Sequence, residues 1–262
     1  MNYLKDYREG EKFVGTYLCK QKQILKTKAG KTYYSLTLQD KTGTADGKIW
    51  ELNNGIANFE PMDYIHCEGM VTSFQGNLQM NISRVRISDE GEYDPADYVP
   101  CTNKDVGEMF SRILKYVASV QNKYLRKILE MYFVENKEFV DAFKKHSAAK
   151  SVHHGFMGGL LEHTLSVTDM CQYFAEHYPM IHRDLLITAA LFHDMGKIQE
   201  ISDFPMNDYT DDGQLLGHIY IGARCMENAA AQIPNFPPKL KNELVHCILA
   251  HHGELEYGSP KR

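Results

Sequence analysis

This sequence lacks long apolar runs, and it lacks pairs of cysteines at the spacing of zinc fingers. No stretch approaches the ~20 apolar residues of a membrane span, and the start, MNYLKDYREGEKF, lacks the apolar core of a signal peptide. The 6 cysteines are scattered, which disfavours thiolate ligation and suits a reducing compartment. We therefore expect a cytoplasmic protein with no membrane partner.

Acidic residues are absent between Glu11 and Asp40, although the 262 residues carry a net charge of -5. Residues 1–90 hold 12 Lys and Arg against 11 Asp and Glu, and residues 91–262 hold 17 against 23. A concentrated positive segment of this kind attracts phosphate backbones. The alternative is a solvated, lysine-rich hairpin. The lysines of the acid-free interval are Lys12, Lys20, Lys22, Lys26, Lys28 and Lys31.

Apolar and polar residues alternate with a period of two through the first part of the chain, which predicts short half-buried strands. We also expect a short helix over residues 52–59. Five strands with a helix in that slot match the partly open barrel of an OB-fold, a fold whose middle strands and first loop bind single strands. The expected strands are residues 12–25, 32–39, 44–51, 64–74 and 78–87.

The same alternation assigns the two faces of the middle strands. Leu36, Leu38 and Ile49 fall on the core side, and Tyr33, Lys48 and Trp50 fall on the outer side. Aromatic side chains beside lysines suit the stacking of bases over a basic groove, and the lysine-rich interval falls in the loop between the first two strands. Packing of the aromatics against the second domain is the alternative. The candidate nucleic-acid-binding residues are Lys26, Lys28, Lys31, Tyr33, Lys48 and Trp50.

Helical spacing replaces strand alternation in the second part of the chain. We expect an OB-fold domain over residues 1–90, an acidic linker with two prolines over 91–103, and an all-helical domain over 104–262. The fold class is thus a β-barrel followed by a helical domain. The expected helices are residues 104–120, 123–134, 137–146, 159–177, 183–195, 216–233 and 238–251.

Histidines recur at or near the ends of these helices. A single histidine on a helix is more often structural than a metal ligand, but here three helices offer imidazole and a fourth offers His193 next to Asp194. The buried helix that ends there needs a cation to compensate the aspartate, and Lys197 lies on the same face, where it can hold a phosphate. The candidate metal ligands are His163, His193, Asp194, His218 and His251, with His252 beside them.

The ordered pattern of His163, then His193 and Asp194, resembles the HD superfamily of metal-dependent phosphohydrolases. Together with the first half of the chain, it is similar to the YhaM-type 3′-to-5′ exoribonucleases. The segments that carry this resemblance are YYSLTLQDKTGTADGKIWE, HHGFMGGLLEHTLSV, ALFHDMGK and ILAHHGELEYGSPKR.

The resemblance implies a site for two divalent ions, manganese first, with cobalt, iron or zinc as alternatives. His163, His193 and Asp194 would bind one ion, and Asp194 would bridge to a second held by His218 and His251. The catalytic residues would be Asp194, Lys197 and His252, acting with a metal-activated water. HD proteins usually add an aspartate after the HHG segment, and this sequence ends at Arg262 without it. A shortened form, another subunit or water would account for that.

Three functions follow as hypotheses. The first is a metal-dependent 3′-to-5′ exoribonuclease that hydrolyses single-stranded RNA, and the sequence leaves open whether it also hydrolyses single-stranded DNA. The second is an HD phosphodiesterase that acts on small nucleotides or cyclic dinucleotides, which the basic first domain disfavours. The third is a non-catalytic single-strand-binding protein with an incomplete HD site. The sequence leaves open whether the chain forms a homo-oligomer.

Overall fold

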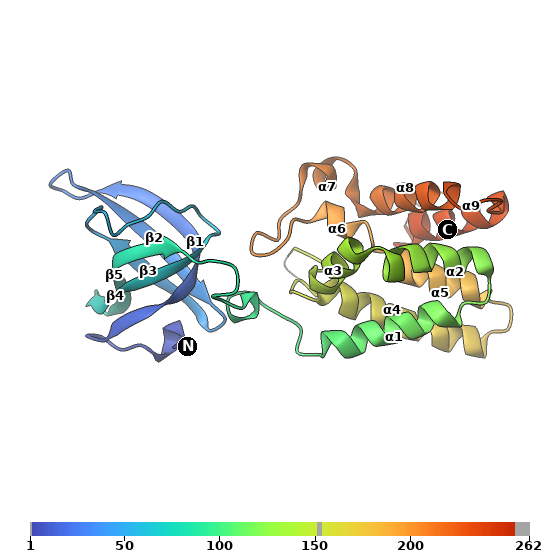
Figure 1. The fold of residues 1–262 in the computed structure, drawn as a ribbon, viewed down its shortest axis with the longest axis horizontal. Coiled ribbons are helices and arrows are strands. Elements are labelled where there is room, and N and C mark those ends of the chain that lie inside the picture. Colours follow the sequence, from blue (N-terminus) through green and yellow to red (C-terminus); the bar gives the residue numbers. More distant parts are fainter. Residues whose placement is uncertain (1, 151–153, 255–262) are drawn as a thin grey trace. The chain divides into compact units, whose positions relative to one another are not determined.

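The computed structural model describes residues 2–150 and 154–254. Residues 255–262, which end the last motif quoted above, lie outside this range. The chain divides into two compact units, residues 1–100 and residues 101–262 (Figure 1). The first is a β-barrel and the second is helical, so the predicted fold class is confirmed.

The first unit is a closed five-stranded barrel with the strand order β1-β2-β3-β5-β4. All neighbours are antiparallel except β3 and β5. The long strand β1 pairs with both β2 and β4, which closes the barrel in the arrangement of an OB-fold. The strands are β1 (Lys12–Lys26), β2 (Thr32–Asp40), β3 (Gly43–Ile49), β4 (Tyr64–Phe74) and β5 (Asn77–Ile87).

The barrel interior contains the side chains that the period of two assigned to it. Leu36, Leu38 and Ile49 are buried in one cluster with Phe13. A bulge at Glu68 and Gly69 shifts the β4–β5 register, and a Cβ at Gly69 would lie 2.0 Å from the carbonyl oxygen of Asn81. Only glycine therefore fits this tight part of the barrel wall.

The predicted helix over residues 52–59 is wrong, because this segment pairs with β5 instead. Ile56 forms a parallel bridge with Val85, whose N–H donates to the carbonyl of Gly55. The backbone N–H of Gly55 also donates to the side chain of Asn53. These hydrogen bonds hold the segment as a turn and an extended strip, in which the backbone donors are satisfied without a helix.

The acidic segment after β5 is packed in part onto the barrel. The ring of Tyr93 stacks on Tyr64 with 4.1 Å between centroids, and Tyr98 is buried. The side-chain amide of Gln39 donates to the carbonyl of Tyr98. Residues as far as Pro100 accordingly belong to the first unit.

The second unit contains helices in all seven predicted segments. Two short helices, α6 and α7, were not predicted, and a π-helical turn, Met131–Glu135, follows α2. No described helix is long and apolar enough to cross a membrane. The helices are α1 (Val106–Ser119), α2 (Lys123–Glu130), α3 (Lys137–Lys145), α4 (Gly159–His177), α5 (Arg183–Phe192), α6 (Lys197–Glu200), α7 (Asp211–Leu215), α8 (Gly217–Ala231) and α9 (Pro238–Ala250).

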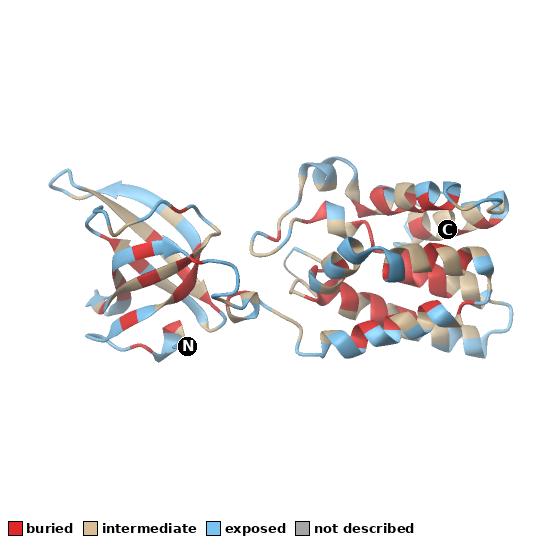
Figure 2. Ribbon diagram, viewed as in Figure 1, coloured by how far each residue is buried: buried red, intermediate tan, exposed pale blue. Residues whose placement is uncertain are grey.

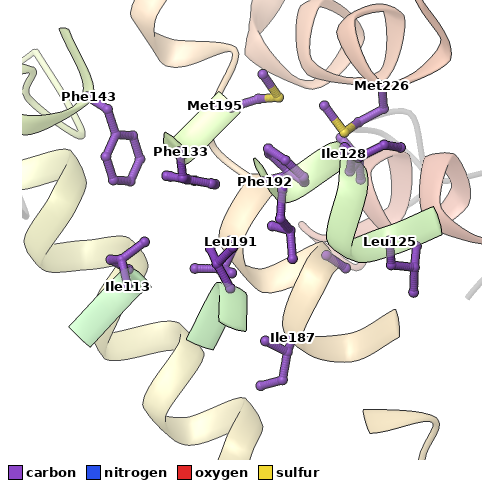
Figure 3. Packing of buried hydrophobic residues seen from close by; sticks show 14 of the residues in the cluster. Ile113, Leu125, Ile128, Phe133, Phe143, Ile187, Leu191, Phe192, Met195 and Met226 are labelled. Atoms are coloured by element: carbon purple, nitrogen blue, oxygen red, sulfur yellow. The ribbon is translucent and has the colours of Figure 1, made fainter. Parts of the chain in front are cut away.

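Helix α5 is the centre of this unit, as its nearly continuous apolar sequence predicts. It packs against α1, α2, α4 and α9, and its residues from Ile187 to Phe192 are buried (Figure 2). Ile187, Leu191 and Phe192 lie among Phe133 and side chains of the other helices (Figure 3). This packing fixes the end of α5, where His193 and Asp194 follow.

Candidate active site

Polar side chains from α4, α8 and α9 meet His193 and Asp194 at the end of α5. His163 lies in the second turn of α4, His218 in the first turn of α8, and His251 directly after α9. They surround Asp194, which is only 2% exposed. The sequence thus identified side chains that are brought together from segments up to 88 positions apart.

The two carboxylate oxygens of Asp194 face different histidines. Its Oδ2 lies 3.2 Å from Nε2 of His163 and 3.3 Å from Nε2 of His193. These two imidazole nitrogens are 3.1 Å apart. The three ligand atoms therefore form one compact group that could hold a metal ion.

On its other side, Asp194 directs Oδ1 toward a second group. This oxygen lies 3.6 Å from Nε2 of His218 and 3.5 Å from Nε2 of His251. Among the described residues, all three atoms are buried without a hydrogen-bond partner. His252 completes a group of three imidazoles with His218 and His251.

Hydrogen bonds at the far ring nitrogens fix how these imidazoles face the centre. Nδ1 of His193 lies 2.7 Å from the carbonyl of Ala190, and Nδ1 of His251 lies 2.7 Å from that of Ile248. A carbonyl only accepts, so each Nδ1 carries the proton. Nε2, the other ring nitrogen, faces the centre and binds a metal once it carries no proton.

Glu200 fixes the orientation of His218 in the same way, and this residue was not predicted from the sequence. Its Oε1 accepts hydrogen bonds from Nδ1 of His218 at 2.8 Å and from the backbone N–H of His218 at 2.9 Å. Burial raises the pKa of Glu200, but His218 outweighs this and lowers it below its ordinary value. Glu200 is one acid in a four-residue helix, and only its burial in the fold distinguishes it from a surface residue.

The donor set fits divalent ions. Ligand atoms at ~2.0–2.2 Å from one ion in tetrahedral geometry are separated by roughly 3.3–3.6 Å, as the oxygen and nitrogens of the second group are. Buried polar atoms without a hydrogen-bond partner are costly, and a bound cation removes that cost. Burial alone would raise the pKa of Asp194, but His163, His193 and His251 hold it well below its ordinary value. Asp194 is thus a carboxylate.

Lys197 reaches the same carboxylate from the first turn of α6. Its Nζ donates to Oδ2 of Asp194 over 2.8 Å. The ammonium therefore lies against the first group of ligand atoms, within reach of any phosphate that binds there. It offers one positive charge that does not depend on bound metal.

Gly196 allows α6 to approach α8 closely enough for this arrangement. A Cβ at Gly196 would lie 2.1 Å from the carbonyl oxygen of His218. Its φ of -64° is ordinary for a helix, so the requirement comes from space and not from backbone strain. The glycine lets the segment that carries Asp194 contact the helix that carries His218.

The barrel brings together two of the candidate nucleic-acid-binding residues. Tyr33 and Trp50 stack with 4.6 Å between ring centroids, and Trp50 is 40% exposed. The indole N–H of Trp50 donates to Oδ1 of Asn81, a partner that the sequence did not reveal. The two aromatic side chains form one partly exposed platform.

The lysines are placed differently from expectation. The acid-free interval was expected in the loop between the first two strands, but β1 continues to Lys26, so only Lys28 and Lys31 lie in that connection. Alternating apolar residues keep the interval paired with β2 and β4. Lys31 forms an ion pair with Glu51 at 3.3 Å. Lys48 contacts Asp46 and Ser35, and its side chain is 14% exposed.

The family model described as the HD domain matches residues 160–261 of this chain. These residues include every ligand atom described above. One solved structure that resembles the barrel is the second OB-fold domain of replication protein A from Methanococcus maripaludis. It is 20% identical, covers 35% of this chain and 98% of that chain, and has a TM-score of 0.28.

Three curated relatives match most of the chain, and each is described as a 3′-5′ exoribonuclease YhaM. The protein from Geobacillus sp. (strain WCH70) is 31% identical over 88% of this chain and 71% of its own length. The Listeria innocua protein is 31% identical over 98% of this chain and 82% of its own. The Bacillus subtilis protein is 30% identical over 88% and 73%.

Proposed function

Because the chain belongs to the family of YhaM exoribonucleases and is an enzyme that hydrolyses phosphodiester bonds, we propose that it removes nucleotides from the 3′ end of single-stranded RNA. Its HD domain makes it a metal-dependent phosphohydrolase. The direction of hydrolysis, the single-stranded RNA substrate and the use of two ions are the parts that we propose. Manganese is the ion to test first.

The observation that carries this proposal is the two-sided environment of Asp194. His163 and His193 face one carboxylate oxygen, while His218 and His251 face the other. We assign His163, His193 and Asp194 to one ion. We assign Asp194, His218 and His251 to a second. Divalent ions bound there supply activation of the attacking water and neutralisation of phosphate charge.

The protein's own side chains then position the substrate. The Nζ of Lys197 is held beside Asp194, where it can donate to a non-bridging oxygen of the scissile phosphate and stabilise charge that develops on it. His252 lies next to His218 and His251 and faces the same site. We assign it to contact with the substrate phosphate.

The barrel offers the second contact with RNA. Tyr33 and Trp50 present a stacked aromatic surface, and base-aromatic stacking tolerates any sequence. Lys26 and Lys28 are exposed at the neighbouring end of β1 and its turn. We propose that this surface binds the strand by stacking and by charge, as an exonuclease without sequence preference requires.

The test uses the same RNA labelled at either end, with manganese or cobalt. A 3′-to-5′ enzyme turns 5′-labelled RNA into a ladder and releases 3′-labelled mononucleotide from the start. His193→Ala and Asp194→Ala should abolish both signals, and His66→Ala, which changes a barrel histidine outside both ligand groups, should leave them. The proposal fails if the wild-type protein does not shorten RNA, or if the ladder survives both site variants. Hydrolysis of cyclic dinucleotides without hydrolysis of RNA would favour the second hypothesis.

A further inference from the structure

The face of α4 that carries His163 continues as an apolar stripe to the end of the helix. Val167, Phe174 and Tyr178 follow His163 at intervals of 4, 11 and 15 residues. With 3.6 residues per turn, these positions lie within roughly a sixth of a turn of one another. At about 1.5 Å per residue, the stripe extends ~16 Å from His163 to Phe174.

One cavity joins the start of this stripe to the metal-ligand groups. It has a volume of about 650 Å³, and its polar lining consists of the site residues His163, His193, Asp194, Lys197, His251 and His252, together with His246. The remainder is largely apolar and contains no phenyl, phenol or indole ring among the described lining residues. The apolar lining comes from three helices and comprises Val167, Cys171, Leu186, Ala189, Ala190, Cys247 and Ala250.

Farther along α4, the stripe becomes aromatic and exposed. Phe174 is 43% exposed and Tyr178 is 49% exposed, and their ring centroids are 6.1 Å apart. Large apolar side chains that gather at the surface usually mark a binding site. On α4 they follow Cys171, which lines the cavity that contains Asp194, so a strand that leaves the cavity along this face would meet them.

The acidic side chains of α4 lie away from the stripe. The acidic residues of α4 are Glu162, Asp169 and Glu176, which lie roughly a quarter to two fifths of a turn from His163 around the helix. Asp169 is paired with Arg112 at 2.7 Å, and Glu162 with Lys104 at 3.0 Å. The stripe itself therefore carries no carboxylate that would repel a phosphate backbone.

We propose that the α4 stripe is the track for the bases of the strand next to the scissile phosphate, an inference that rests on the proposed function. The apolar cavity wall takes the base nearest the metal groups by van der Waals contact. Phe174 and Tyr178 stack bases farther along the same single strand. Apolar walls and aromatic faces read no base edge, so the track accepts any sequence.

The experiment compares Phe174→Ala and Tyr178→Ala with a matched variant in the full chain. Tyr220 is 50% exposed on α8, and it lies two residues after His218, on the far side of that helix. Tyr220→Ala therefore removes an equally exposed ring away from the cavity. Binding of a fluorescent RNA oligonucleotide is measured by anisotropy in a chelator, and KM is measured with manganese.

Loss of a stack should weaken RNA binding about tenfold in each stripe variant. The loss should be seen both in the dissociation constant measured in the chelator and in the KM measured with manganese. Tyr220→Ala should keep the wild-type affinity. If Phe174→Ala and Tyr178→Ala bind RNA as tightly as Tyr220→Ala does, the proposal is overturned. A change of molecular mass by light scattering in the stripe variants, with RNA affinity unchanged, would also overturn it and assign this face to a second copy of the chain. Failure of the wild-type protein to shorten RNA would instead refute the proposed function.

Discussion

Glu200 holds His218 through two hydrogen bonds from the same residue, one from the imidazole Nδ1 at 2.8 Å and one from the backbone N–H at 2.9 Å. The ring can therefore neither rotate nor change its tautomer without losing a bond to a buried carboxylate. Its Nε2 is directed toward Asp194. A carboxylate behind a metal-binding histidine raises the basicity of the ligand as well as orienting it.

Replacing Glu200 should weaken the second metal group specifically. Loss of an outer partner of this kind typically costs 10–100-fold in metal affinity, so we expect about that loss for Glu200→Leu. Glu200→Gln keeps an acceptor oxygen and should recover much of the affinity. Isothermal titration with manganese measures both, and Glu227→Leu, an exposed position on α8, is the control. Wild-type affinity in Glu200→Leu would show that Glu200 does not orient His218.

Enlarging Gly196 should damage both stability and the site. A methyl group there meets the carbonyl of His218 at 2.1 Å, so α6 and α8 must move apart. We expect Gly196→Ala to lower the free energy of unfolding by about 1–3 kcal/mol and to weaken metal binding. Gly222→Ala is the control, because its new Cβ would make an ordinary contact at 3.5 Å with Ile248. Equal denaturation midpoints for the two variants would contradict this account.

Removing Trp50 should weaken RNA binding without affecting the metal site. The expected loss is about 1–3 kcal/mol for one stack, measured as RNA affinity of the full chain. Trp50→Phe retains an aromatic face on Tyr33 and should recover most of the affinity, whereas Trp50→Ala should not. If the alanine variant binds RNA as well as the wild type, Trp50 has a packing role instead.

Lys197 should matter for turnover more than for metal binding. Its ammonium contacts Asp194 but is not a metal ligand, so Lys197→Met should keep the bound metal. Loss of one donor to the developing phosphate charge typically costs 100-fold or more in kcat. Metal analysis and RNA hydrolysis on the same preparation separate the two effects. Loss of metal together with activity would assign Lys197 to the assembly of the site.

Features with a repeating physical cause were predictable from the sequence. Half-buried strands alternate because side chains point to opposite faces, and all five strands of the barrel were predicted. The helix that leads to His193 and Asp194 was predicted because it is apolar on every side and must be buried. Histidines near the ends of several helices indicated a shared site, because packed helices can bring residues at their ends together.

Features set by a single tertiary contact were not predictable. Residues 52–59 had helical spacing but pair with Val85, and no local pattern reveals that partner. Helices α6 and α7 are too short to show a period. Glu200 belongs to the site only because α6 packs on α8, which depends on Gly196. Lys48 has the spacing of an outer residue, but its partner Ser35 on β2 depends on the strand register, which is visible only in the structure.

The number of ions bound per chain tests the central claim that Asp194 joins two metal groups. Protein purified without affinity metals and equilibrated with manganese should bind two ions by atomic emission. His163→Ala and His218→Ala should each bind about one, because each removes one group and spares the other. Asp194→Ala should bind neither ion firmly. A wild-type chain that binds a single ion, lost equally in His163→Ala and His218→Ala, would contradict the account.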